Sequence, residues 1–416
     1  MEKKQFGILS LPVIVAALGY FVDIYDLLLF TIVREPSLTS LKVDMTQKAM
    51  VIAASTKVIN WQMWGMLIGG IIWGVMGDRK GRLSVLFGSI ILYSIANFLT
   101  GYVQDIQQYA IARFAAGVGL AGELGAGITL VSELLPKSKR GIGTSMVAGI
   151  GLFGAVAAYF TYKLSGDWRL CYKIGGGLGV VLLILRISVT ESGMFKEVQQ
   201  KAHVVRGNFL MFFQDAKRFR KYMLAILIGL PTWFVIGVLV NLSNQFATDF
   251  YGKENNHIES GRAIMYAYAA IAIGDILVGF VSQYFKSRKK ALYLFYFFAI
   301  VSGIYFFSGN IKNDATMYAA CAALGFSTGF WAIFVTMGAE QFGTNLRATA
   351  ATTIPNMVRG SLPLINLMFV NWFQKANGWS FVNSAIITGV IVMVITLIAA
   401  YFTEETFHKD LNYEES

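Results

Sequence analysis

Charged residues are scarce in this chain of 416 residues: Asp, Glu, Lys and Arg make up 14% of it, whereas a soluble domain carries about 25%. Hydrophobic residues make up 56%, and the mean hydropathy is +0.57. This composition indicates that lipid surrounds most of the chain. In hydrocarbon, only helices and closed barrels satisfy the backbone hydrogen bonds. Barrel strands alternate apolar and polar residues, but the apolar runs here are continuous, so we expect an all-α integral membrane protein.

Histidine and cysteine are nearly absent as well. All three histidines, His203, His257 and His408, fall in expected loops or in the tail. A membrane-embedded hydrolase or transferase needs an activated nucleophile or metal ligands, so we expect neither an enzyme nor a metal or cofactor site. The two cysteines, Cys171 and Cys321, lie in expected spans and predict no disulfide framework.

Twelve apolar segments are long enough to cross a bilayer as helices, which takes about 20 residues each. They lie at residues 8–33, 49–76, 83–103, 107–132, 141–164, 169–189, 220–247, 260–285, 290–309, 315–341, 346–376 and 379–402. If the N-terminus is inside, most Lys and Arg residues fall on the cytoplasmic side, as the positive-inside rule requires. We therefore expect a multi-pass protein of the plasma (inner) membrane with both termini in the cytoplasm. The net charge of +11 then follows from topology and does not indicate a nucleic-acid partner.

The twelve spans divide into two sets of six. We expect an N-terminal six-helix bundle at residues 1–190, a cytoplasmic linker at 191–219, and a C-terminal six-helix bundle with a short cytoplasmic tail at 220–416. Within the linker, the stretch NFLMFFQDAKRFRKY has a hydrophobic half and a basic half. This pattern predicts an interfacial helix on the membrane surface, and a plain linker is the alternative.

Two charged pairs indicate that the halves are repeats. Glu133 and Arg140 follow the fourth span, and Glu340 and Arg347 follow the tenth span at the same spacing. Internal repeats of this kind mark secondary transporters, in which the substrate site lies at the interface between the repeats. Both pairs are expected at the same membrane edge. We expect them to form an ion-pair network that gates the protein, and solvated surface charge is the alternative.

Several motifs resemble the major facilitator superfamily. GVMGDRKGR, from Gly74 to Arg82, resembles the family's signature loop between helices 2 and 3. RFAAGVGLAGELGAG, from Arg113, resembles its helix 4 motif, and Glu123 within it resembles the metabolite:proton symporter branch. VSELLPKSKRG and GAEQFGTNLRAT resemble the Glu-to-Arg motifs after helices 4 and 10. The resemblance implies twelve transmembrane helices in two pseudo-symmetric six-helix bundles, alternating access, and a monomer.

The signature loop predicts a cytoplasmic gate. A carboxylate such as Asp78 can lie at the N-terminus of another helix, where the helix dipole favours negative charge. The family resemblance implies that this helix is the eleventh, starting near Thr344. Arg79 and Arg82 can pair with acids or with lipid phosphates. We expect these contacts to close the cytoplasmic side; the alternative is that the loop is basic for reasons of topology alone.

Ionisable residues inside the spans indicate the coupling site, because a charge at membrane depth is costly and faces a cavity or a partner. Asp23 and Asp26 lie on one face of the first span, and the fourth span carries Arg113 and Glu123. A carboxylate that alternately pairs with Arg113 and faces a cavity could bind and release a proton. We expect Asp23, Asp26 or Glu123 to do so, with Asp26 and Glu123 ahead. The alternative is a permanent ion pair between the two helices.

Cations inside the spans bear on the charge of the substrate. If Arg113 is neutralised locally, Lys57 and Arg359 lack an obvious partner, and one cation from each half suits an anion. Lys57 could instead snorkel outward, and Arg359 could pair with Asp275. The substrate-binding residues that we expect are Lys57, Asn60, Arg113, Trp233, Asn244, Asn356 and Arg359.

Together these features predict a secondary active transporter that moves a small polar, anionic metabolite by alternating access and proton-coupled symport. A neutral solute and a cation are the alternatives for the substrate. A multidrug or metabolite exporter of the same fold, working by proton antiport, is the alternative function, and a mostly aromatic pocket with one lone acid would favour it. The expected partners are the substrate, protons and the lipid bilayer.

Overall fold

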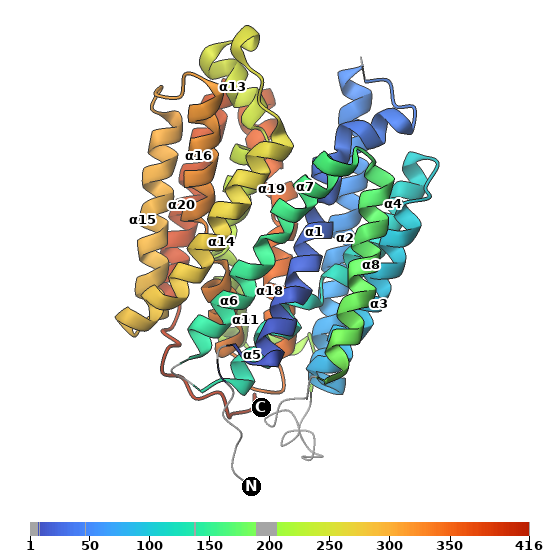
Figure 1. Cartoon of the computed structure of the whole chain (residues 1–416). Coiled ribbons are helices and arrows are strands. Elements are labelled where there is room, and N and C mark those ends of the chain that lie inside the picture. Colours follow the sequence, from blue (N-terminus) through green and yellow to red (C-terminus); the bar gives the residue numbers. More distant parts are fainter. Residues whose placement is uncertain (1–6, 8, 46, 137–138, 189–205, 416) are drawn as a thin grey trace.

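The structure is a computed structural model that describes residues 7, 9–45, 47–136, 139–188 and 206–415. Long helices packed side by side make up the molecule (Figure 1). Among the described residues, eleven helices are long and apolar enough to cross a membrane. The remaining span, the eleventh in chain order, consists of α18 (Arg347–Gly360), α19 (Leu362–Asn366) and the π-helical segment η4 (Leu367–Ala376). Its polar residues lower its hydropathy. The prediction of an all-α membrane protein with twelve spans is confirmed.

The first six spans pack together on the right of Figure 1. Four of them are continuous, and the fourth and fifth spans are each broken into two helices. The helices are α1 (Leu11–Ser40), α2 (Lys48–Lys80), α3 (Arg82–Thr100), α4 (Ile106–Leu120), α5 (Glu123–Leu134), α6 (Arg140–Leu152), α7 (Gly154–Ser165) and α8 (Trp168–Leu185), followed by the short η1 (Arg186–Ser188). The break between α4 and α5 places Glu123 in the first turn of α5, where the helix dipole stabilises a carboxylate.

The last six spans form the second bundle. Its seventh span is divided into α11, α12 and the π-helical η2, and its tenth into α16 and α17. The elements are α10 (Met211–Gln214), α11 (Ala216–Leu227), α12 (Leu230–Phe234), η2 (Val235–Val240), α13 (Ser243–Tyr251), η3 (Lys253–Asn255), α14 (Ser260–Phe285), α15 (Arg288–Phe307), α16 (Asp314–Ser327), α17 (Trp331–Glu340) and α20 (Phe381–Phe402), with α18, α19 and η4 before α20.

Most of the expected linker at 191–219 lies outside the described residues. From residue 206 on, the chain forms the four-residue α10 and then enters α11. Phe212 of α10 stacks on Tyr222 with ring centroids 4.5 Å apart and contacts Phe342 edge-on. This described part therefore packs against the C-terminal bundle. The interfacial helix and the bounds of the three domains stay predictions.

The two bundles meet mainly along two helix pairs, α2 with α18 and α6 with α14. Glycines let the backbones approach in both pairs. A Cβ added at Gly74 of α2 would lie 2.9 Å from the Cα of Thr349, and one at Gly279 of α14 would lie 2.6 Å from the Cβ of Ser145. Gly74 and Gly279 precede the corresponding loops of the two halves, so the packing between the bundles repeats in the way that the sequence does.

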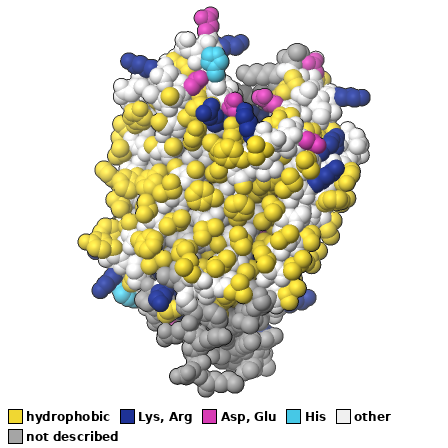
Figure 2. Space-filling view, in the orientation of Figure 1, with side chains coloured by type: hydrophobic (Ala, Val, Ile, Leu, Met, Phe, Trp, Pro, Cys, Tyr) yellow, Lys and Arg dark blue, Asp and Glu magenta, His cyan; other side chains and the backbone are white. Residues whose placement is uncertain are grey.

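Apolar side chains cover the middle of the molecule, and charged side chains gather toward its two ends (Figure 2). Large hydrophobic residues on several spans are exposed, for example Ile95 on α3, Ile184 on α8 and Ile398 on α20. In a chain of this composition such a surface faces acyl chains. We call the membrane side at which α1 begins and the chain ends the termini face, and the other side the opposite face.

Candidate functional site: a central cavity and its gate

Asp78 of α2 joins the two bundles at the termini face. Its buried carboxylate accepts hydrogen bonds from the backbone N–H groups of Ala348 and Thr349, at 3.0 and 2.8 Å. The Thr349 hydroxyl donates to the same carboxylate at 2.7 Å. Ala348 and Thr349 form the first turn of α18, where the free N–H groups and the helix dipole stabilise negative charge.

A buried ion network surrounds this contact. A Glu133 carboxylate oxygen lies 2.8 Å from an Arg82 nitrogen in its own bundle and 3.1 Å from an Arg347 nitrogen in the other bundle. Arg82 also lies 3.6 Å from Asp78 and donates to the carbonyl of Thr344 at 3.2 Å. Because a buried charge is tolerated only when it is paired, these contacts favour the closed arrangement of the termini face.

The remaining expected gate residues lie around the network. Glu340 pairs within its own bundle with Arg288, at 3.2 Å. Arg140 donates to a backbone carbonyl of its own bundle at 3.3 Å, and among the described residues it forms no ion pair. Arg79 is exposed and donates to the carbonyl of Arg206 at 3.3 Å. Arg288 was missed by sequence analysis, although it belongs to the basic cluster that follows the eighth span.

The C-terminal tail covers the gate. Thr344, in the loop between α17 and α18, donates its N–H to the carbonyl of Tyr413 at 2.8 Å and its hydroxyl to the carbonyl of Leu411 at 3.1 Å. Arg347, the cation that pairs with Glu133, also donates to the Leu411 carbonyl. The Leu411 side chain is fully buried. The tail is thus bound to the same loop that closes against the N-terminal bundle.

Glu405 anchors the start of the tail to the N-terminus of α15. Its carboxylate accepts from the N–H groups of Arg288 and Lys289, at 2.9 and 3.2 Å, and from the Ser287 hydroxyl. Burial raises the pKa of the Glu405 carboxyl, but the hydrogen bonds from Ser287, Arg288, Phe407 and Lys289 lower it by more. The pKa therefore lies below its ordinary value.

Two of the three expected proton carriers are paired with cations inside the N-terminal bundle. Asp26 lies 3.1 Å from a guanidinium nitrogen of Arg113. Glu123 lies 2.6 Å from Arg186. All four side chains are buried. Sequence analysis took Arg113 as a substrate residue and missed Arg186, even though it falls within the bounds of the sixth expected span and could have been found as an intramembrane cation.

Asp23 differs from the other two acids. Its side chain is fully buried, and neither carboxylate oxygen has a hydrogen-bond partner in the part of the chain that the structure describes. It shares one face of α1 with Tyr20 and Leu27, which line the central cavity. An unpartnered buried carboxylate is costly when it is charged, so Asp23 is the acid whose environment least resembles that of a structural ion pair.

The central cavity lies between the two bundles. It has two adjacent parts of about 20 and 70 Å³, both of which have Leu27, Trp233 and Tyr268 in their walls. Tyr20 and Trp331 add aromatic surface to the smaller part. A space of this size holds water molecules and is well below the several hundred Å³ of a typical ligand pocket. A metabolite therefore fits only when the bundles move further apart here.

Arg359 of α18 lines the smaller part of the cavity. It is 3% exposed, and it forms no ion pair within the described ranges. One guanidinium nitrogen donates to the side-chain oxygen of Asn356 at 2.9 Å, and the guanidinium carbon lies 5.7 Å from the Trp331 ring centre. The pairing with Asp275 considered for Arg359 is not present. One Asp275 oxygen accepts from the N–H of Ala332 at 2.9 Å, and the other has no hydrogen-bond partner among the described residues.

Of the other expected substrate residues, some lie at the cavity or between the bundles, and others lie away from them. Trp233 lines both parts of the cavity, and Asn356 reaches across to the carbonyl of Ala121 in the N-terminal bundle at 3.1 Å. Lys57 and Asn60 are exposed on α2 and are not among the cavity-lining residues. The interpretation of Lys57 as a buried cation is therefore wrong.

Asn244 also lies away from the cavity. It is exposed on α13, where its side-chain amide donates to the carbonyl of Ile258 at 3.0 Å. This bond ties α13 to the chain before α14 and gives Asn244 a local role. In the smaller part of the cavity, sequence analysis did not assign the aromatic wall residues Tyr20, Tyr268 and Trp331, since aromatic residues are too numerous in this chain for their type alone to identify them.

Known proteins agree with this architecture. The sequence model of the Major Facilitator Superfamily matches residues 16–365. The chain is 25% identical to a putative metabolite transport protein of Haemophilus influenzae, over 93% of this chain and 94% of the relative. It is 23% identical to the niacin transporter NiaP of Acinetobacter baylyi, over 81% of each. The solved proton:xylose symporter XylE has the same fold, with a TM-score of 0.76 and 15% identity over 97% of each chain. This chain therefore belongs to the major facilitator superfamily and is a multi-pass membrane transporter, not an enzyme.

Proposed function

We propose that the protein imports a small carboxylate with an aromatic ring, together with a proton. The observation that carries this proposal is the Arg359 guanidinium, which lines the cavity without an ion-pair partner among the described residues. A buried cation needs a compensating negative charge. A substrate carboxylate can supply that charge and bind the planar guanidinium through two parallel hydrogen bonds.

The walls around Arg359 support a ring as the rest of the substrate. Tyr20, Trp233, Tyr268 and Trp331 line the same part of the cavity as Arg359 and give it aromatic surface, on which a flat ring can stack or pack edge-on. Niacin, named as the cargo of the Acinetobacter baylyi relative, is a carboxylate on a pyridine ring and has both features. This combination of one cation with aromatic walls favours an anion over the cationic or neutral drugs of the exporter alternative.

Asp23 is the acid that we assign to proton coupling. Its oxygens have no hydrogen-bond partner in the described part of the chain. Tyr20 and Leu27, on the same face of α1, line the part of the cavity that Arg359 also lines. When Asp23 is charged, it offsets part of the positive potential of Arg359. When Asp23 is protonated, that potential remains available to a substrate anion. Proton binding and anion binding therefore favour each other, and this reciprocity is the basis of symport.

The ion pairs of Asp26 and Glu123 leave these acids a structural role in the described conformation. This assignment reverses the order expected from the sequence, in which Asp26 and Glu123 came ahead of Asp23. Each of the two has a cation of its own bundle within 3.1 Å. If either acid bound a proton, the Arg of its own bundle would lose its negative partner. The change in charge would fall beside that Arg, so neither acid changes the charge balance beside Arg359 as directly as Asp23 does.

The transport cycle needs two states, one with the gate at the termini face closed and one with it open. If the N-terminus is cytoplasmic, the Asp78 and Glu133 contacts close the inner side. The central cavity is too small for a metabolite as described, so the bundles must first separate at the outer side. A proton and a substrate anion then enter from outside, the bundles rock, and the Glu133–Arg347 pair separates to release both inside. In this scheme the protein works as a monomer in the inner membrane.

Thermal-shift binding to the purified protein tests the anion site. Nicotinate and nicotinamide form a matched pair, because they have the same ring and differ in the charge of one substituent. We expect nicotinate, but not nicotinamide, to stabilise the wild type. Arg359→Ala should weaken the nicotinate effect by about 10- to 100-fold, as expected for a lost hydrogen-bonded charge pair. Asn244→Ala, an exposed amide change, should bind as the wild type does.

Equal stabilisation of the wild type and Arg359→Ala by nicotinate would remove Arg359 from the substrate site. Stabilisation by nicotinamide alone would exclude the anion. Benzoate serves as a third ligand, because it keeps the carboxylate and removes the ring nitrogen. If benzoate binds and nicotinate does not, the carboxylate site stands and the substrate is a benzene-ring acid.

A further inference from the structure

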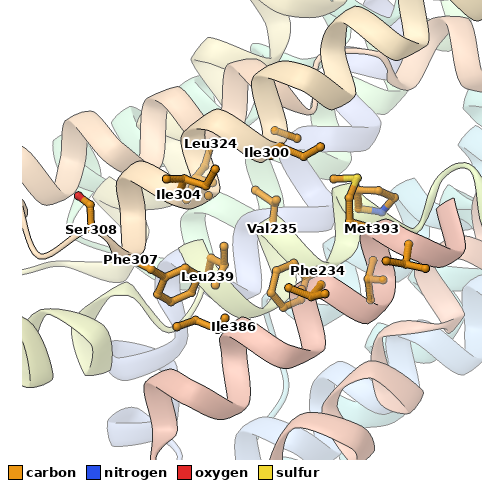
Figure 3. A pocket seen from close by; sticks show the side chains of 17 residues that line it. Phe234, Val235, Leu239, Ile300, Ile304, Phe307, Ser308, Leu324, Ile386 and Met393 are labelled. Atoms are coloured by element: carbon orange, nitrogen blue, oxygen red, sulfur yellow. The ribbon is translucent and has the colours of Figure 1, made fainter. Parts of the chain in front are cut away.

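A large apolar cavity lies away from the transport site. It is a groove of about 560 Å³ in the C-terminal bundle, between α15 and α20, with α12 and η2 as its floor. Figure 3 shows Ile300 and Ile304 on one wall, Ile386 on the other, and Val235 and Leu239 between them. Among the described residues that line it, Ser308 alone has a polar side chain, and its hydroxyl donates to a backbone carbonyl. The groove therefore has little to offer a polar or charged ligand.

The groove opens to the membrane rather than to water. Ile304 is 66% exposed and Val390 is 51% exposed, and both stand on helices that cross the membrane. Gly303 widens the groove, because a Cβ added there would meet no atom within 4 Å. The medium in contact with these residues is the hydrocarbon of the bilayer. An apolar groove open to hydrocarbon takes an acyl chain.

The end of the groove near the opposite face has a different chemistry. Ile386 belongs to the groove and also to a second hollow of about 510 Å³, which is lined by Trp379, Ser380 and Asn383 at the N-terminus of α20. Tryptophan is enriched at the headgroup level of membranes. The Ser380 hydroxyl and the Asn383 amide offer hydrogen bonds, and none of the described residues that line the hollow is charged.

We propose that the groove and the hollow together bind one phospholipid from the leaflet at the opposite face. One acyl chain lies in the groove between α15 and α20, and the headgroup lies beside Trp379. The Ser380 hydroxyl and the Asn383 amide can donate hydrogen bonds to a phosphate, and the amide oxygen can accept one from an ammonium group. The headgroup of phosphatidylethanolamine has both groups. This site is separate from the substrate cavity, and its occupancy does not depend on the identity of the substrate.

The seventh span connects the two sites. Val235 and Leu239 of η2 face the groove, and Ile236 and Gly237 of the same segment line the central cavity. An acyl chain packed in the groove therefore contacts one face of η2, and another face of η2 lines the central cavity. We expect the bound lipid to stabilise the C-terminal bundle as well as to occupy the groove.

Native mass spectrometry of the delipidated, full-length protein tests the site. The probe is palmitoyl-oleoyl phosphatidylethanolamine, titrated against the wild type and two variants. Gly303→Leu fills the groove, and Gly177→Leu is the matched control on α8, where an added Cβ likewise meets no atom within 4 Å. We expect one tight lipid on the wild type and on Gly177→Leu, and about tenfold weaker binding to Gly303→Leu. Equal binding by the two variants would overturn the proposal.

A second measurement uses the wild type alone, so it does not depend on the folding of a variant. A phosphatidylethanolamine with a photoreactive group on its acyl chain is crosslinked to the protein in vesicles of palmitoyl-oleoyl phosphatidylcholine. We expect the labelled peptides to come from residues 299–308 and 386–394, which include the groove walls. Labels spread evenly over the exposed spans of both bundles would show ordinary bilayer contact and overturn the site.

Discussion

The Glu133 carboxylate lies 3.1 Å from the guanidinium of Arg347, which stands in the other half of the chain. In sequence, each half repeats its own Glu and Arg motif. In the structure, the Glu of the first half meets the Arg of the second half. The duplicated motif therefore forms an ion pair between the two bundles. We call this Glu133–Arg347 pair the latch of the termini face.

Removing the charge of Glu133 should open this latch. Glu133→Gln leaves Arg82 and Arg347 buried with less negative charge to offset them. Breaking a buried pair in this way costs about 3 kcal/mol, so we expect a lower melting temperature and a larger population open at the termini face. The measurement is the rate at which a thiol reagent labels Thr352→Cys, a position 1% exposed on α18, in a chain without Cys171 and Cys321.

Glu254→Gln is the control for this experiment. Glu254 is exposed in the short η3 segment between α13 and α14, so its charge can be removed without breaking a buried pair. We expect the control to label as slowly as the parent. If Glu133→Gln also labels at the parent rate and melts at the parent temperature, the latch role of Glu133 is wrong.

Close packing of α5 on α18 should be as important as the ion pairs in keeping the termini face closed. A Cβ added at Gly125 would lie 2.5 Å from the Cα of Thr352, too close for any real contact. A Cβ at Gly127 on the same helix would lie at an ordinary 3.5 Å from Ala16. We therefore expect Gly125→Ala to push the bundles apart at the termini face and Gly127→Ala to leave them in place. Cysteine labelling at Ala348→Cys, a fully buried position of α18 that lies 3.0 Å from a Cβ added at Gly77 of α2, measures both variants against the parent.

Asp23 and Asp26 should respond oppositely to neutralisation. Asp26→Asn removes the charge that compensates the buried Arg113, so we expect a loss of about 3 kcal/mol in stability. Asp23→Asn removes a charge that has no hydrogen-bond partner among the described residues, so we expect unchanged or higher stability. Melting temperatures of the two variants in the same detergent check this. A larger loss for Asp23→Asn than for Asp26→Asn would reverse the roles assigned to the two acids.

The anchor at Glu405 predicts an acid-sensitive tail. Its pKa in the folded protein lies below the ordinary value, so its contribution to stability is complete above the unfolded-chain pKa of about 4.3 and is lost as pH falls through the folded-state pKa. The side chain is partly exposed, so the effect is small. We expect Glu405→Gln to melt slightly below the wild type at pH 7, and the difference to shrink as pH falls below about 4.3. A constant difference across this range would contradict the anchor.

The membrane fold could be predicted because it depends on composition. Scarce charge and continuous apolar runs identify spans without any knowledge of how they pack. The polar span at 346–376 was recognised as well, although it is not among the eleven described helices that are long and apolar enough to cross a membrane. The breaks within spans, such as the one between α16 and α17, could not be predicted in the same way, because Asp275 from another helix satisfies the freed N–H of Ala332.

The sequence does not predict which of the buried acids and cations pair with one another. Asp23 and Asp26 are the same residue type on one helix face, and only packing decides that Arg113 reaches Asp26. Arg186 meets Glu123 from a different helix at 2.6 Å, and no local pattern marks such a contact. Lys57 shows the reverse case: its place within an apolar segment was read as burial, but burial depends on which face of α2 its neighbours cover.

The pH dependence of nicotinate binding, measured between about pH 6 and 8 where nicotinate is an anion, tests the account most directly. For the wild type we expect the affinity to fall as pH rises, by up to about tenfold per pH unit, because the anion and the proton bind together. For Asp23→Asn we expect tight binding that does not vary over the same range, since the neutral amide mimics the protonated acid beside Arg359. A variant that binds nicotinate but keeps the wild-type slope would contradict the coupling of Asp23 to Arg359.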